Sequence, residues 1–475
     1  MSTLNSQPIS KSAAWIVRAL LLVLGTVMIV YAVSDHPLYG DEPGFGRLQI
    51  LISALGGAIA LCSLLPMKMA TPVLILGVTS LAMLGLAEVA GEMVLGARYR
   101  PIFQPDDRLI FKFIPNRRSV MTRAPWNGGE TITHRINSEG FRGDKLRPAG
   151  SAARVVVYGD SFIHAYYTAQ ENTFTARLGV LLSEQMGREV EAVNAGLSSY
   201  GPDQISLKME DELPRLRPDL VVVSIFAGND YGDLLRSKIF RIGDGGALQP
   251  NNWILDPKVR MWLQISQQES ILLRALRSIV RSRLSPAATN ADATNLEFLL
   301  AEAEREYQSF IVEGDNVVTN THLDYYSADV SLRPKSASAL YKVALMREVL
   351  RRIRDVAARN GVPLVFLFIP HPADVTESYD QWRFDRARFP DYDGRNQTGP
   401  LEDMARSLSV PFVSLHHIFR EKDANFLYFH GGDDHWNDAG QAMAARVMTD
   451  FLMARRLPQH LQPASIMPPP GHTRP

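Results

Sequence analysis

Three long apolar segments fill the first part of the chain, with short polar connections between them. They run over residues 13–33, 48–67 and 72–95. Each approaches the roughly 20 apolar residues that a helix needs to cross a bilayer. One such segment also fits a buried helix of a soluble core, and the first fits a cleavable signal peptide. Because three segments follow in succession, we predict three transmembrane helices over residues 1–96.

Charges in the connections predict how these helices are oriented. Lys11 and Arg18 stand at the start of the first segment, and Lys68 lies between the second and the third. The connection after the first segment is mainly acidic. Positive residues favour the cytoplasmic side, so three crossings place the rest of the chain on the periplasmic or extracytoplasmic side. Arg98 and Arg100, just after the third segment, oppose this orientation.

Beyond residue 150 the pattern changes to short apolar runs that alternate with segments of helical periodicity. The predicted strands are 154–158, 190–194, 220–226, 363–369 and 411–414, and the predicted helices are 173–186, 204–213, 337–360 and 438–455. Continuous apolar strands are typical of a sheet that is covered on both faces. Their alternation with helices predicts an α/β fold, with a doubly wound parallel sheet.

These patterns divide the chain into four parts. The predicted parts are an anchor over 1–96, a linker or pre-domain over 97–150, an α/β domain over 151–457 with an insertion over 236–335, and a disordered Pro-rich tail over 458–475. Within the pre-domain, residues 131–136 alternate as a strand would. The insertion holds helical stretches at 267–283 and 296–311, and we expect it near the active-site end of the sheet.

Composition narrows the possible partners. The 475 residues carry 50 Lys and Arg against 50 Asp and Glu, so the formal net charge is zero. Proteins that bind nucleic acid usually present a basic surface, and we therefore predict no nucleic-acid partner. Cys62 is the single cysteine of the sequence and cannot form an internal disulfide, so cysteine content does not indicate a redox compartment.

The first candidate site is the run Gly159-Asp160-Ser161-Phe162, directly after the strand at 154–158. In open α/β sheets, sites form beyond the carboxyl ends of the strands. A serine on the turn into a helix can expose its hydroxyl, and the first amides of the helix can face a developing oxyanion. An ordinary helix N-cap explains the same residues.

Two further polar clusters lie at predicted element ends. Gly228-Asn229-Asp230 follows the strand at 220–226, and its asparagine amide can donate a hydrogen bond to an oxyanion, although this run also suits a plain turn. His435 precedes the last helix and can take a serine proton. We predict Asp433 as the carboxylate that orients this imidazole, with Asp434 as the alternative.

The cluster around His435 has two other interpretations. Acidic residues are favoured at a helix start, which needs no catalytic role. His430, Asp433, Asp434 and His435 also offer ligand atoms for a metal ion, but no matching ligand set occurs elsewhere in the chain. We therefore predict neither a metal nor a cofactor.

Taken together, the three clusters resemble the SGNH hydrolase family, also called GDSL esterases and lipases. The resemblance covers about residues 150–455. It implies a flavodoxin-like sheet and a catalytic triad of Ser161, His435 and Asp433. It also implies that the Ser161 amide, the Asn229 side chain and one backbone amide of a further block bind the oxyanion.

That further block departs from the family pattern. It corresponds to residues 194–201, where the family's oxyanion glycine falls on Ser199, and Gly201 lies two residues beyond. Because a backbone amide does not require glycine, we predict Ser199 as the donor, with Gly201 as the alternative. Residues 136–142 resemble a lead-in found before this domain in bacterial members, and the sequence suggests no role for them.

The resemblance implies a serine esterase that works through an acyl-enzyme. An outward-facing domain tethered to a membrane suggests an acylated glycan or lipid as the ester substrate. Two other functions stay open at this point. An O-acyltransferase would use the same triad with a sugar hydroxyl in place of water, and a membrane scaffold would keep the fold without catalysis.

Overall fold

The structure is a computed structural model that describes residues 10–34, 46–284, 296–312, 317–319, 327–376, 387–422, 424–430 and 433–457. The chain forms two compact units, which are described separately below. One unit comprises Met1–Pro101 and Pro257–Pro286, and the other comprises Ile102–Asp256 and Ala287–Pro475. The predicted tail over 458–475 lies outside the described residues.

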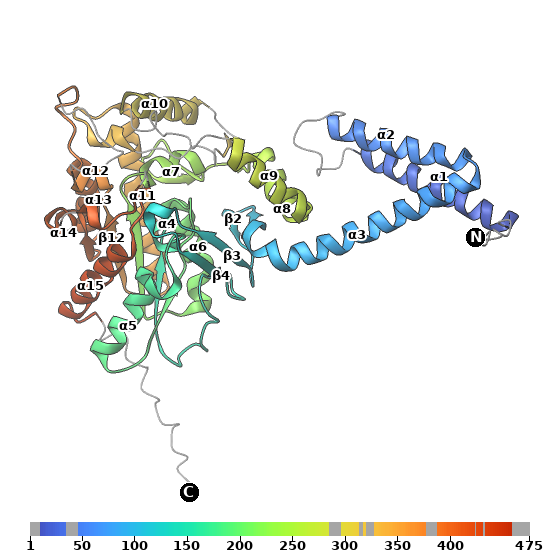
Figure 1. The fold of residues 1–475 in the computed structure, drawn as a ribbon. Coiled ribbons are helices and arrows are strands. Elements are labelled where there is room, and N and C mark those ends of the chain that lie inside the picture. Colours follow the sequence, from blue (N-terminus) through green and yellow to red (C-terminus); the bar gives the residue numbers. More distant parts are fainter. Residues whose placement is uncertain are drawn as a thin grey trace, which may run out of the picture. The chain divides into compact units, whose positions relative to one another are not determined.

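The first unit contains the apolar helices α1 (Lys11–Val33), α2 (Arg47–Leu61) and α3 (Met67–Tyr99) (Figure 1). Helices α1 and α3 are long and apolar enough to cross a membrane. The second predicted span, over 48–67, is shorter than expected, because α2 has 15 residues and ends in a 3-10 turn. Pro66 causes this difference, since it cannot continue a helix and instead stands at the start of α3.

Helices α1 and α2 pack closely through two glycines. A Cβ atom on Gly25 would come within 2.3 Å of the Gly56 carbonyl oxygen, and one on Gly56 would meet the Gly25 carbonyl oxygen at 2.8 Å. Small residues at such contacts let helix backbones approach one another, as is common between helices in membranes. The two helices therefore form a tightly packed pair.

Helices α8 (Pro257–Gln268) and α9 (Ile271–Leu284) belong to this same unit, although the sequence places them in an insertion of the α/β domain. The carboxylate of Glu88 in α3 accepts hydrogen bonds from the Ser270 hydroxyl at 2.8 Å and from the Ile271 amide at 2.6 Å. A carboxylate at a helix N-terminus is favourable. Glu88 therefore caps α9 from within an apolar helix.

The second unit is built on a five-stranded sheet. Its strands are β5 (Ala153–Tyr158), β6 (Val190–Asn194), β7 (Leu220–Phe226), β12 (Leu364–Ile369) and β13 (Phe412–Ser414). All neighbours pair in parallel in the order β13-β12-β7-β5-β6. This order is that of flavodoxin-like folds, whose crevice opens between the first and third strands. The predicted fold class and all five predicted strands are confirmed.

Helices cover the sheet and connect its strands (Figure 1). The helices of this unit are α4 (Ser161–His164), α5 (Phe174–Met186), α6 (Pro202–Leu216), α7 (Asp230–Ser237), α10 (Leu296–Val312), α11 (Ala337–Arg359), α12 (Pro372–Val375), α13 (Arg395–Ser407), α14 (His416–Glu421) and α15 (Asp438–Ala454). Helix α5 packs on α15, and α6 packs on α11. Side chains along a strand alternate between the two faces of the sheet. Because the strands are mainly apolar, both covered faces are mainly apolar.

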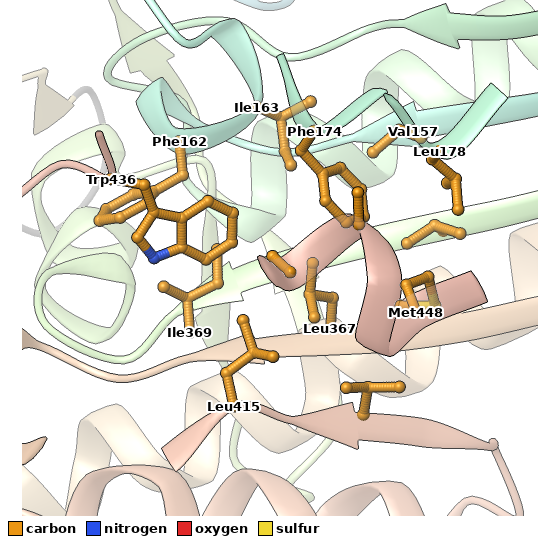
Figure 2. Packing of buried hydrophobic residues seen from close by; sticks show 14 of the residues in the cluster. Val157, Phe162, Ile163, Phe174, Leu178, Leu367, Ile369, Leu415, Trp436 and Met448 are labelled. Atoms are coloured by element: carbon orange, nitrogen blue, oxygen red, sulfur yellow. The ribbon is translucent and has the colours of Figure 1, made fainter. Parts of the chain in front are cut away.

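The core beneath α5 and α15 extends to the residues next to both candidate catalytic side chains. Figure 2 shows Phe162 and Trp436 packed in the same buried cluster as Val157 and Leu367 of the sheet. The ring centroids of Phe162 and Trp436 are 5.1 Å apart, and both side chains are almost fully buried. Ser161 directly precedes the buried Phe162, and His435 directly precedes the buried Trp436.

The second unit also contains short antiparallel strand pairs. They are β1 (Phe103–Asp106) with β2 (Ile110–Phe113), β3 (Arg118–Thr122) with β4 (Thr131–Arg135), and β8 (Phe240–Ile242) with β9 (Leu248–Pro250). Two further short strands, β10 (Trp253–Ile254) and β11 (Val317–Val318), pair in parallel. The strand predicted at 131–136 is thus confirmed as β4.

Arg142 gives the lead-in segment a structural role. Its side chain is buried, and its guanidinium donates hydrogen bonds to the carbonyl oxygens of His164, Ala165 and Thr168. These carbonyls lie at the end of α4 and in the turn that follows, where Ala165 has a φ of 53°. The last carbonyls of a helix need partners from outside the helix. Arg142 therefore holds the turn that follows Ser161.

We expect Arg142→Met to lower the free energy of unfolding by about 3 kcal/mol, because it leaves buried carbonyl oxygens without donors. The measurement is chemical denaturation of the full chain in detergent, followed by tryptophan fluorescence. Arg135→Met is the matched control, since the Arg135 side chain is 55% exposed and pairs with an exposed aspartate. Equal losses in both variants would contradict this role of Arg142.

We expect Gly196→Ala to destabilise the α/β unit by about 1–3 kcal/mol through overpacking. A Cβ atom there would meet the His164 amide nitrogen at 2.5 Å and the Ile163 Cβ at 2.6 Å. Gly399→Ala is the control, because nothing lies within 4 Å of its added Cβ, and alanine is the better helix former. Denaturation curves of both variants test the prediction, which fails if Gly196→Ala unfolds like the wild type.

Candidate active site

Ser161 is the first residue of α4, directly after β5. The N-cap is Asp160, whose Oδ1 accepts a hydrogen bond from the Phe162 amide at 3.0 Å. The helix N-cap that the sequence suggests within this run is therefore Asp160. Gly159 permits the turn, because a Cβ there would come within 2.1 Å of the Ser224 hydroxyl on β7. Ser161 itself is partly exposed.

His435 is held by Asp433. Its Nδ1 lies 2.7 Å from Asp433 Oδ1, and its backbone amide donates to the same oxygen at 3.0 Å. Asp434 Oδ1 is more distant, at 3.4 Å from Nδ1. Between the two predicted carboxylates, the geometry therefore favours Asp433 as the orienting partner. With Nδ1 engaged in this way, Nε2 is the ring nitrogen left for a proton acceptor role.

The His435 imidazole lies against the segment that carries Ser161. The ring centroids of Phe162 and His435 are 5.0 Å apart, and the two rings are inclined by 30°. Tyr167, a few residues further along, approaches the same imidazole with a centroid distance of 6.0 Å. The structure thus brings the first and last predicted blocks together at the carboxyl edge of the sheet.

Three carboxyl groups shape the charge of this imidazole. Burial lowers the pKa of His435, but the negative charges of Asp433, Asp434 and Asp160 outweigh it and raise that pKa to about 10. Burial raises the pKa of Asp160 to about 7, against the opposing effects of the Phe162 amide and of His435. The site therefore favours an imidazolium strongly over a neutral imidazole.

Asp434 has a second histidine nearby. His371 Nε2 lies 3.9 Å from Asp434 Oδ2, and His371 Nδ1 accepts the Ala373 amide at 3.1 Å. Because Nδ1 accepts, Nε2 carries the proton. Burial lowers the pKa of His371 well below its usual value, which keeps this ring uncharged.

The two candidate donors of the second block differ in availability. Ser199 has a φ of 65°, in the left-handed region that favours glycine, which fits the glycine expected there from the family. The Gly201 amide already donates to Gln204 Oε1 at 3.0 Å at the start of α6. Among the described residues, the Ser199 amide has no such acceptor. The geometry therefore favours Ser199 over Gly201.

Asn229 stands at the N-cap of α7, on a turn that is fixed on both sides. Asp230 Oδ2 accepts the Phe226 amide at 2.7 Å, and the Gly228 carbonyl accepts the Ser327 amide at 2.5 Å. A Cβ on Gly228 would collide with the Phe226 ring at 2.4 Å, so glycine is required there. The backbone that carries Asn229 is therefore rigid.

Sequence reasoning missed His164 as part of the site's framework. Its side chain is fully buried, and its Nδ1 lies 2.6 Å from the Ser198 hydroxyl. Burial, together with the charges of His134 and Arg142, lowers the pKa of His164 well below its usual value. This uncharged ring joins the helix of Ser161 to the block that holds Ser199. The lead-in motif over 136–142, which contains Arg142, is the sequence feature that could have indicated this buried cluster.

The metal interpretation of the last block has a partial geometric basis. Asp433, Asp434 and His435 each offer a ligand atom, and these atoms lie within 4.8 Å of one another. His430, the fourth predicted ligand, is not in this group. A metal on Nδ1 of His435 would replace the hydrogen bond that this nitrogen donates to Asp433. The arrangement therefore fits a carboxylate–imidazole pair better than a metal site.

Comparison with known proteins adds independent findings. The GDSL-like Lipase/Acylhydrolase family matches residues 157–401 of this chain. No curated protein matches it. Similar solved structures include the lipase/acylhydrolase from Enterococcus faecalis, with 11% identity over 64% of this chain and 96% of that chain, at a TM-score of 0.31. Another is a catalytic mutant of Axe2, an acetylxylan esterase from Geobacillus stearothermophilus, with 11% identity over 64% and 96% and a TM-score of 0.32.

The family match spans more than half of the chain and includes Ser161 and Asn229, whereas Asp433 and His435 lie beyond it. The five-stranded parallel sheet has the strand order that the resemblance implied. The chain therefore belongs to the GDSL-like lipase/acylhydrolase family, the SGNH hydrolases, and is a hydrolase of ester bonds.

Proposed function

We propose that this protein is a serine esterase with Ser161, His435 and Asp433 as its catalytic triad. The observation that carries the proposal is the 2.7 Å contact between His435 Nδ1 and Asp433 Oδ1, made by an imidazole that also packs against Phe162. The acid–base pair lies beside the segment that carries the Ser161 hydroxyl, at the crevice of an α/β sheet, and ester hydrolysis through a serine requires an acid, a base and a hydroxyl in such a crevice.

In the proposed mechanism, the Ser161 oxygen attacks the ester carbonyl while His435 Nε2 takes its proton. Asp433 holds the proton on Nδ1 and stabilises the imidazolium. The nearby negative charges of Asp434 and Asp160 stabilise it further. The tetrahedral intermediate collapses, and the leaving alcohol receives the proton from Nε2. Water then attacks the acyl-enzyme by the same route and releases the acid, which regenerates Ser161.

Three donors would bind the oxyanion in this mechanism. They are the amides of Ser161 and Ser199 and the side-chain amide of Asn229. The left-handed backbone at Ser199 and the engaged amide of Gly201 support Ser199 over its neighbour. Preorganised donors of this kind typically contribute a factor of about 10²–10³ each to the rate.

We also propose that the N-terminal unit crosses the membrane three times, with the hydrolase domain outside the cytoplasm. Helices α1 and α3 have the required length and composition. Together, α2 and its 3-10 turn extend for about 28 Å, close to the roughly 30 Å of the hydrocarbon core. Lys11, Arg18 and Lys68 then lie on the cytoplasmic side. This location favours acylated glycans or lipids as substrates.

A fluorophosphonate probe should label the wild type, and Ser161→Ala should abolish both this label and most hydrolysis of p-nitrophenyl acetate. We expect the hydrolysis rate to fall by about 10⁴ or more, because the nucleophile is lost. Ser151→Ala is the control, since Ser151 is exposed and bonds the Pro148 carbonyl on the surface. If Ser161→Ala were still labelled, another residue would be the nucleophile.

The pH dependence of kcat/KM should reflect the raised pKa of His435. A general base acts in its neutral form, so activity should rise with pH, and its acid limb should lie above the ordinary histidine value of 6.5. Asp434→Asn removes a charge that raises this pKa and should therefore shift the limb to lower pH. Asp450→Asn, on an exposed position of α15, should leave the limb unchanged. A limb that moves equally in both variants, or in neither, would rule out this role of Asp434.

A further inference from the structure

A small pocket lies beside the acid of the proposed triad. Its cavity volume is about 160 Å³, and its walls include Arg123, Trp126, Asn127, Tyr167, Phe429 and Asp433. Asp433 also bonds His435, and Tyr167 contacts the same imidazole ring. A ligand in this pocket would therefore adjoin the catalytic base. Part of its wall comes from the pre-domain, outside the residues that the family matches.

The pre-domain wall is fastened to the loop that precedes His435. It is made by Arg123, Ala124, Trp126 and Asn127, of which the last two belong to the 3-10 turn Pro125–Asn127 between β3 and β4. The Trp126 indole N–H donates to the His430 carbonyl at 3.3 Å, and the Asn127 side chain donates to that same oxygen at 2.9 Å. In return, the His430 amide donates to Asn127 Oδ1 at 2.9 Å. These bonds set the position of the indole at the edge of the pocket.

The charge of Arg123 is neutralised within the protein. Its side chain is buried, donates to the Tyr167 carbonyl, and pairs with Glu130 at 3.0 Å and with Asp438 at 2.6 Å. The guanidinium also lies over the Phe429 ring, 5.1 Å from its centroid. Two carboxylates already balance this cation, and Asp433 adds a further negative group to the lining. The pocket therefore suits a neutral ligand rather than an anionic one.

The side chain of Trp126 is unusually exposed for an aromatic residue. It is 66% exposed, although its N–H edge is tied to the His430 carbonyl. An exposed aromatic face next to hydrogen-bonding groups is typical of small-ligand sites. A pyranose ring matches this arrangement, because its faces carry C–H groups and its rim carries hydroxyls. An acyl chain would instead need a uniformly apolar wall, whereas this pocket includes Asn127 and Asp433.

The volume limits the size of the ligand. Cavities of about 150 Å³ accommodate one benzene molecule, so about 160 Å³ suits one six-membered ring that extends partly into solvent. We propose that the pocket binds one sugar ring of a glycan substrate, stacked on Trp126, and so directs an acyl group on that glycan to Ser161. This inference rests on the proposed function and specifies its substrate class.

Binding of unacylated oligosaccharides to the full-length Ser161→Ala variant tests the proposal without any need for catalysis. The protein is placed in nanodiscs, because common maltoside detergents carry sugar rings themselves. Xylo-, manno-, cello- and chito-oligosaccharides are titrated by calorimetry. We expect at least one series to bind, and the added Trp126→Ala change to weaken that binding about tenfold or more through loss of the aromatic face.

Two further variants sharpen the result. Trp126→Phe keeps an aromatic face and should retain part of the affinity. Phe298→Ala is the matched control, because Phe298 is a 47% exposed aromatic residue on α10 and does not line the pocket. Binding by this control should equal that of the parent Ser161→Ala protein.

The proposal is overturned if no oligosaccharide binds at millimolar concentration, or if Trp126→Ala binds as tightly as its parent. It is also overturned if decanoate, and no sugar, binds in a Trp126-dependent way, because the pocket would then hold an acyl chain. The proposed triad is tested separately. It is contradicted if the fluorophosphonate probe still labels Ser161→Ala. The two ideas can therefore be judged independently.

Discussion

The packing of Phe162 against Trp436 is the contact on which the site depends. Each aromatic ring is nearly fully buried and is the immediate neighbour of a proposed catalytic residue, Ser161 or His435. Interiors of proteins are close-packed, so two buried rings 5.1 Å apart leave their backbones little freedom. Hydrophobic burial in the core thus sets the approach of two segments that are far apart in the sequence, and the polar contacts refine a geometry that the core already imposes.

The charge distribution follows from this burial. His435 lies close to Asp433, Asp434 and Asp160 in a partly buried crevice. The lower effective dielectric constant there strengthens the attraction between the imidazole and these carboxyl groups. Asp160 is needed at its position as the N-cap of α4, and Asp433 is needed to fix the imidazole through two contacts to one oxygen. The same residues that build the local backbone would therefore also stabilise the imidazolium of the proposed proton transfer.

The sequence predicted the sheet well because its signal is local. Continuous β-branched runs such as those of β5 and β7 admit few other interpretations, and their bounds agree with the structure to within a residue. The length of α2 was overestimated, because apolar composition continues through a break that Pro66 imposes on the backbone. The preference for Ser199 over Gly201 could not be read from residue types, since it depends on a left-handed φ and on an amide already bonded to Gln204. The partners of Arg142 lie beyond any local pattern, because the carbonyls that it binds are brought to it by the tertiary fold.

Similar contacts join the predicted pre-domain to the α/β domain. A boundary at residue 151 follows from periodicity, which is interrupted before β5. Physically, however, buried hydrogen bonds cross that boundary, from Arg142 to the turn after α4 and from the Gln204 side chain to the Leu109 carbonyl at 2.8 Å. A fragment that starts at residue 151 would lose these hydrogen bonds, at a net cost of about 1 kcal/mol each, together with the burial around them, which is an appreciable part of the stability of a typical domain. The residues after Pro101 lie in the same compact unit as the sheet, extend its buried polar network and supply Trp126 beside its proposed acid–base pair.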